Sequence, residues 1–114
     1  MASSSYGTVT VPLDAVAAGN LMTVPEGGVV VRLPAPRRVS RLTAALTASY
    51  DYEVQVLDGS TVVAKLESPR LGWQAQGEAP RELTLTPAVT AGAWRIRCGR
   101  GFGRCAFGQV VLAD

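Results

Sequence analysis

Short apolar runs rich in Val, Thr, Leu and Tyr recur along the chain, with Gly, Pro or Asp between them. Breaks spaced about eight to twelve residues apart are typical of an all-β sandwich or barrel. We expect about eight strands, in chain order at residues 7–12, 28–33, 39–47, 50–57, 60–67, 82–86, 93–98 and 105–112. The sequence therefore predicts an all-β fold, a single antiparallel β-sandwich (jelly-roll-like) with little or no helix.

The stretches between these strands have distinct expected structures. Residues 13–20 are Ala-rich but too short for a stable isolated helix, so we expect a single helical turn there. Residues 34–38 (PAPRR) and 68–80 lack strand periodicity and are expected to be longer loops.

The chain length fits one hydrophobic core. It has 114 residues, 47% of them apolar, which is too few for two separate domains. We expect residues 6–114 to form one β-sandwich domain and residues 1–5, with three Ser, to be a loose arm. Residues 1–7 have neither a basic start nor an apolar run, so no secretion signal is expected. The longest uncharged stretch has 13 residues and contains three Ser, so no transmembrane segment is expected either.

The chain contains no His, which removes the commonest general base and the commonest metal ligand. A Ser-His-Asp or Cys-His catalytic site cannot be built from it. Its two Cys cannot alone supply the four ligands of a structural zinc site. A net charge of +2 gives no reason to expect nucleic acid as the partner. We therefore expect a protein that is not an enzyme and that holds no cofactor and no metal.

Residues 50–67 carry the clearest hairpin signal, two alternating runs on either side of Asp58-Gly59. A two-residue turn at this dipeptide would mix polar and apolar groups on one face of the sheet. The alternation therefore favours a three-residue loop at 57–59 with Gly59 left-handed. The aligned pairs are then Val54 with Val62, Tyr52 with Ala64, Tyr50 with Leu66 and Asp51 with Lys65.

A second hairpin is expected over residues 93–112, with its loop at 99–104. Alternation directs one set of side chains inward, namely Trp94, Ile96, Cys98, Cys105, Phe107, Gln109 and Val111. In this hairpin Cys98 and Cys105 lie opposite one another, close enough for a disulfide. A disulfide and two buried thiols both remain open, and the missing secretion signal favours the thiols.

The loop at 99–104 is the best candidate site. Four Arg lie within ten residues around it, and three Gly in the loop let the backbone approach a partner closely. Phe102 at the loop tip can insert into a neighbouring subunit or stack on a base. We expect Arg100, Phe102 and Arg104 to contact a partner protein, with a solvated hairpin loop as the alternative.

Two other charged clusters are weaker candidates. Arg37 and Arg38 are also expected to bind a partner, although protection of a strand edge explains them equally well. Asp51 and Glu53 lie on one strand face, as the two carboxylates of a glycosidase do. Lys65 on the opposite strand offers a simpler explanation, in which the acids and the base compensate each other across the sheet.

Two features resemble known protein families. The segment RELTLTPAVTAGAWRIRCG, residues 81–99, resembles the end of many jelly-roll and galactose-binding-like sandwiches. In size and class, a short all-β chain with a Ser-rich arm and Arg-bearing loops also resembles the small accessory proteins of phage particles, such as capsid decoration proteins. This second resemblance implies a virion structural protein made in the host cytoplasm, which binds a larger shell protein, copies of itself, or both.

The alternative hypothesis is a carbohydrate-binding module of the β-sandwich class. An exposed Trp is the side chain on which such modules stack a sugar ring, and Trp73 lies in the expected loop at 68–80. Tyr50 is the second candidate platform for a glycan. An aromatic plug over the end of the sandwich also explains Trp73.

Overall fold

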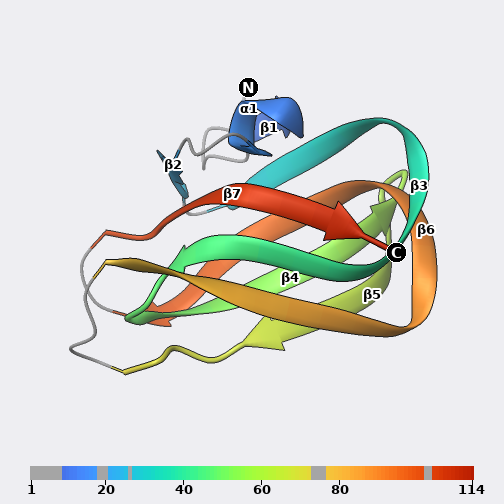
Figure 1. Ribbon diagram of the computed structural model, residues 1–114. Coiled ribbons are helices and arrows are strands. Elements are labelled where there is room, and N and C mark those ends of the chain that lie inside the picture. Colours follow the sequence, from blue (N-terminus) through green and yellow to red (C-terminus); the bar gives the residue numbers. More distant parts are fainter. Residues whose placement is uncertain (1–8, 18–20, 26, 73–76, 102–103) are drawn as a thin grey trace.

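The computed structural model describes residues 9–17, 21–25, 27–72, 77–101 and 104–114. This part of the chain forms seven strands and one helical turn (Figure 1). In order they are β1 (Val9–Pro12), α1 (Asp14–Ala17), β2 (Leu21–Thr23), β3 (Val29–Thr47), β4 (Tyr50–Asp58), β5 (Thr61–Ser68), β6 (Glu78–Gly101) and β7 (Ala106–Ala113). The predicted all-β fold is confirmed, and so is the single helical turn.

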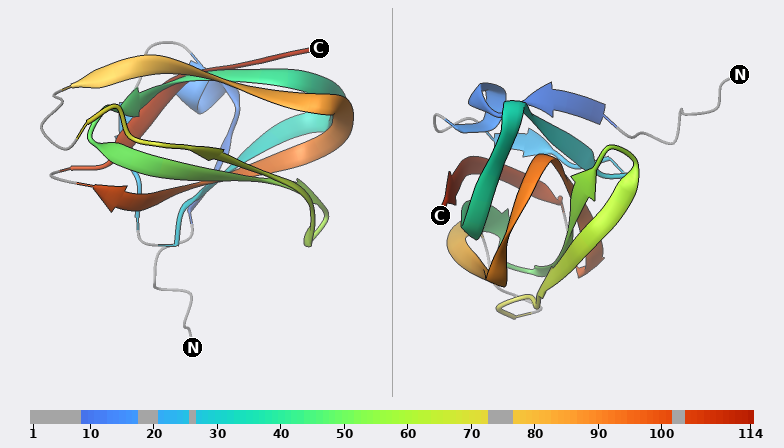
Figure 2. Two further views of the ribbon diagram at one scale, coloured as in Figure 1. Left: turned by 90° about the horizontal axis from the view of Figure 1, so that it is seen from below. Right: turned by 90° about the vertical axis from the view of Figure 1, so that its right-hand side faces the viewer.

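The strands form one continuous sheet in the order β2-β7-β3-β6-β4-β5. Neighbouring strands are antiparallel, except that β1 pairs with β3 in parallel. The long strands β3 and β6 pair in three stretches, residues 29–32 with 93–96, 37–39 with 89–91 and 41–47 with 78–84. The sheet folds over between the first and the last of these stretches, and the molecule thereby acquires two layers (Figure 2).

We call these the first and second layers. The first layer consists of β1, the start of β3, the end of β6, β4 and β5. The second layer consists of the start of β6, the end of β3, β7 and β2. The fold between them is a corner at residues 32–41 of β3, where the β3–β6 register shifts twice.

The corner corrects two predictions. The sequence predicts a loop at 34–38 between two strands, and separate strands at 82–86 and 93–98. The structure instead has continuous strands, β3 and β6, through both positions. Pro34 and Pro36 are tolerated because the register shift takes them out of the regular ladder. Strands merge in this way and β2 is added, so seven strands replace the predicted eight.

Alternation fills the space between the layers with apolar side chains. Val54, Val56, Trp94 and Ile96 of the first layer are each at most 1% exposed. Phe107 of the second layer is fully buried against them. Trp94 and Ile96 are therefore core residues, as their spacing predicts.

The register of the β4–β5 hairpin differs from the predicted one. Val54 pairs with Leu66 rather than Val62, and Lys65 pairs with Gln55 rather than Asp51. The turn lies at residues 59–60, and a bulge at the Val56/Leu57 step shifts the pairs beyond it. Gly59 has a φ of 64°, so it is left-handed as predicted.

The predicted hairpin at 93–112 does not form, because β6 and β7 do not pair in the described structure. The segments on either side of residues 99–104 belong to different layers. On β7 the alternation also changes at Gln109, which has a φ of 53° and opens a bulge opposite β3. Gln109 and Val111 therefore face outward, and Val110 and Leu112 are the buried residues.

Among the described residues, no helix is long and apolar enough to cross a membrane.

Candidate functional site

A disulfide joins the two layers at one end of the sandwich. Cys98 on β6 and Cys105, just before β7, are bonded with their Cα atoms 6.6 Å apart. Cys105 is buried and Cys98 is half-buried. The disulfide thus joins the two ends of the segment 99–104 across the layers, and residues 99–101 of the predicted loop are in fact the last residues of β6. The predicted facing of the two Cys is correct, although they meet across layers rather than along a hairpin. They form a disulfide, whereas the sequence favoured two thiols.

The buried hydroxyls of Tyr52 and Thr47 form hydrogen bonds beside the disulfide. The Tyr52 hydroxyl of β4 accepts a hydrogen bond from the Thr47 backbone N–H at 2.9 Å and donates one to the carbonyl oxygen of Ala106. The Ala106 N–H in turn donates to the Thr47 hydroxyl at 2.9 Å. Burial raises the pKa of Tyr52, although the hydrogen bonds with Thr47 and the charge of Arg81 oppose the rise. Ala106, at the start of β7 just after the segment 99–104, is therefore fixed to both layers.

Arg81 of β6 is buried beside this pair, with 7% of its surface exposed. Its guanidinium donates to the carbonyl oxygens of Thr47 at 2.6 Å and Tyr50 at 3.0 Å, at the connection between β3 and β4. It also donates to Ser68 and Pro69 where β5 ends, and it lies 5.3 Å from the centre of the Tyr52 ring. Burial lowers the pKa of Arg81, while Tyr52 and Asp51 oppose this change.

Neither Arg81 nor its role was among the sequence-predicted site residues. Arg81 precedes an alternating strand, which is also the pattern of a solvent-facing cation. A buried Tyr needs a partner for its hydroxyl, and the structure supplies Thr47 and Ala106 to Tyr52.

The candidate Arg side chains of the loop lie on the outside. Arg100 is exposed and makes no ion pair with any described residue. Arg104 is also exposed, and its Nε donates to the Thr23 hydroxyl of β2 at 2.9 Å. The Thr47 hydroxyl lies 3.3 Å from the Arg104 carbonyl oxygen. Phe102 lies outside the described residues.

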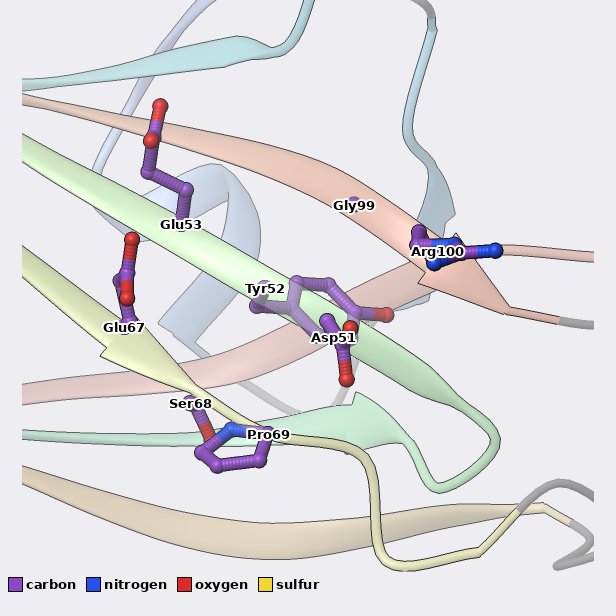
Figure 3. A pocket seen from close by; sticks show the side chains of 8 residues that line it. All are labelled: Asp51, Tyr52, Glu53, Glu67, Ser68, Pro69, Gly99 and Arg100. Carbon is purple, nitrogen blue, oxygen red and sulfur yellow. The ribbon is translucent and has the colours of Figure 1, made fainter.

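Arg100 borders a shallow hollow of about 320 Å³ on the outer face of the first layer (Figure 3). The hollow is lined by Asp51, Tyr52, Glu53, Glu67, Ser68, Pro69, Gly99 and Arg100. Figure 3 shows the carboxylates of Glu53 and Glu67 directed to the same side, from neighbouring strands. These two residues are direct cross-strand partners.

Cations compensate two of the three acids of the hollow. Asp51 accepts hydrogen bonds from the Arg70 backbone N–H at 2.7 Å and its guanidinium at 3.0 Å. Glu53 lies between Lys65, at 3.3 Å, and Arg97, at 3.5 Å. Arg70, rather than the expected Lys65, is therefore the cation that binds Asp51. Lys65 instead forms an ion pair with Glu53.

The other predicted residues do not join this site. Arg37 donates to the Leu112 carbonyl oxygen at 2.6 Å, and Arg38 lies 3.2 Å from the Asp114 carboxylate. Both belong to the corner of β3, beside the C-terminus and at the opposite end of the sandwich from the loop (Figure 1).

Tyr50 and Trp73 are the two residues on which a sugar ring was expected to stack. The Tyr50 ring lies against the backbone of Gly101 and lines a hollow with Cys98 and Arg104. Trp73 lies outside the described residues.

Comparison with known proteins adds no relative. No protein-family model matches the chain, and no curated protein sequence matches it significantly.

Proposed function

We propose that this chain is a non-enzymatic assembly protein of a virus-like particle, such as a phage capsid decoration or accessory protein. It binds a larger protein shell, copies of itself, or both. The observation that carries the proposal is the disulfide-closed segment at residues 99–104, whose Arg100 is exposed and makes no ion pair with a described residue.

The loop is suited to binding because its ends are already fixed. Residues 99–104 contain three Gly, and Gly loses more backbone conformational entropy than any other residue when its conformation is fixed. The disulfide, together with the hydrogen bonds between Tyr52, Thr47 and Ala106, removes part of that cost beforehand. Arg is also among the side chains that contribute most to protein interfaces.

The charge of the loop favours an acidic patch on the partner. Arg100 has no carboxylate of its own to neutralise it within the described chain, so it is available to a partner. Arg side chains can bind carboxylates through two parallel hydrogen bonds, which gives orientation as well as attraction.

Particle binding tests the proposal. Virus-like particles purified from the organism that encodes the chain should contain it by mass spectrometry. Purified chain should rebind particles stripped of it, and Arg100→Glu should weaken rebinding about ten-fold through loss and reversal of a charged contact. Arg32→Glu, an equal charge change at an exposed residue on β3, is the matched control.

Further outcomes separate the hypotheses. Phe102→Ala should also weaken incorporation while leaving the thermal unfolding curve unchanged. Absence of the chain from purified particles overturns the proposal. Saturable quenching of Trp fluorescence by a glycan assigns the chain to the carbohydrate-binding alternative instead, with Trp73 as the first residue to substitute.

A further inference from the structure

We infer that β5 pairs with β5 of a second copy of this chain, antiparallel and with the two Leu66 residues opposite one another. The inference rests on the proposed function, since it names the chain's own partner in self-assembly and the edge that binds it. It uses the free edge of β5, whose Glu67 lines the same hollow as Arg100.

β5 is the outer strand of the first layer, so no strand of the described structure pairs with the other side of its backbone. In the right-hand view of Figure 2 it lies, in yellow-green, at the flank of the molecule. It is eight residues long and contains no Pro. Val62 and Val63 are 46% and 47% exposed. A long edge with exposed apolar side chains is suited to pairing with another strand.

The other free edges in the described structure are blunted. β2 has three residues, and β1 has four and ends in Pro12. The stretch of β6 that borders the second layer contains Pro80, which cannot donate to a new ladder. β7 has its bulge at Gln109. These are devices by which proteins prevent pairing at an edge, whereas residues 64–68 of β5, beyond its bulge at Val63, form a regular ladder with β4.

Charge complementarity selects the partner and the register. When Leu66 faces Leu66, Lys65 of each copy lies opposite Glu67 of the other, on the outer face of the sheet. Within one chain Glu67 instead faces Glu53, and it makes no ion pair with a described residue. The second copy thus supplies the cation that Glu67 lacks, and it does so twice because the pair is symmetric.

The neighbouring registers are disfavoured by the same charges. If one copy of β5 slides along the other but inner-face residues still lie opposite inner-face residues, either Lys65 lies opposite Lys65 or Glu67 lies opposite Glu67. A shift by one residue turns the partly buried Leu66 toward the outer face of the other copy. The register centred on Ala64 gives neither Lys65 nor Glu67 an opposite charge. The sequence of β5 therefore specifies one arrangement.

Apolar contacts follow from the chosen register. Ala64 and Leu66 pack against the core from the inner face of β5. In the pair, Leu66 meets Leu66 and continues the apolar layer from one copy into the next. On the outer face, exposed Val63 lies beside exposed Pro69 of the other copy, where the ladder between the copies ends because Pro has no N–H.

The test is the molar mass by light scattering over a range of concentrations. The wild-type chain should form a dimer that dissociates on dilution. Lys65→Glu and Glu67→Lys each place two pairs of like charges in the interface, so each should raise the dissociation constant about ten-fold or more. Glu78→Lys, the same charge change at an exposed residue of β6, should leave it unchanged.

Charge rescue distinguishes this register from a general loss of solubility or fold. A mixture of the Lys65→Glu and Glu67→Lys variants restores both opposite-charge contacts and should form a heterodimer about as stable as the wild-type dimer. The double variant, with both changes in one chain, should dimerise again as well. Circular dichroism confirms that each variant is folded.

Each remaining outcome has a definite meaning. A wild-type chain that stays monomeric, a dimer indifferent to Lys65→Glu, or a mixture that fails to recover overturns the β5 pairing. A monomer that still rebinds particles overturns the pairing alone and leaves the proposed function standing. A β5-paired dimer that is absent from particles overturns the proposed function alone.

Discussion

Replacing Arg81 with Met should destabilise the fold by about 3 kcal/mol. Met keeps much of the apolar stem but removes the guanidinium, which donates to four carbonyl oxygens and one hydroxyl. Thr47 and Ser68 are buried, so their acceptors lose a partner that water does not readily replace. Each orphaned buried acceptor costs about 1–3 kcal/mol, and two of them at about 1.5 kcal/mol give the total.

Two smaller effects oppose each other. The guanidinium no longer has to be buried, which favours the Met variant. Its contact with the Tyr52 ring is lost, which disfavours the variant by about 1 kcal/mol. Arg81→Lys keeps a positive charge and up to three donors at one point, so it should cost less, about 1–2 kcal/mol.

Urea unfolding followed by Trp fluorescence measures these differences. For 114 residues, an unfolding entropy of about 2.1 cal/mol/K per residue converts 3 kcal/mol into a Tm lower by about 12 °C. A Met variant within about 0.5 kcal/mol of the wild type, with an unchanged urea slope, would show that Arg81 does not hold the strand ends together.

Three further results are expected from the same end of the sandwich. Joint replacement of Cys98 and Cys105 by Ala should cost about 2.4 kcal/mol in calorimetry, the loop-closure entropy for a sequence separation of 7. Tyr52→Phe should cost about 2 kcal/mol in urea unfolding, because the buried Thr47 N–H loses its acceptor. The raised pKa of Tyr52 means that the folded chain keeps this proton where the unfolded chain releases it. Wild-type stability should therefore fall more steeply than that of Tyr52→Phe above pH 10, and parallel curves would contradict the buried hydroxyl.

Local alternation was sufficient to predict the fold class. The spacing of Val54, Trp94 and Ile96 places each of them in the core, where the structure has them. The corner was not predictable in this way, because Pro34 and Pro36 give the same signal in a loop as in a bent strand. Only the pairing of β3 with β6 on both sides of the corner distinguishes the two cases.

The register of the paired strands was the second feature that the sequence did not predict correctly. Alternation assigns a side chain to a face, and a bulge changes that assignment without any unusual residue to mark it. The bulge at Val56/Leu57 moves Leu66 opposite Val54, and the one at Gln109 exchanges the inner and outer residues of β7. Both depend on how distant strands pack, so a period-two count along one segment misses them.

The candidate site, too, was predictable from the sequence only in part. The loop at 99–104 was predictable because its Arg and Gly residues are neighbours in sequence. Its support was not, because Arg81 and Tyr52 meet only when the two layers face each other. A cation before a strand gives no sign that it will be buried among carbonyl groups from three other segments.

The buried contacts and the exposed loop act on one another through Thr47. Arg81 binds its carbonyl oxygen, Tyr52 binds its N–H, and its hydroxyl accepts the N–H of Ala106, one residue beyond the disulfide. A change at Arg81 therefore reaches the base of the loop through a chain of direct hydrogen bonds. If the loop binds a shell protein, Arg81→Met should weaken that binding under conditions where the variant is still folded, because the partner must then order a looser loop. Arg32→Glu, which touches none of these contacts, should not.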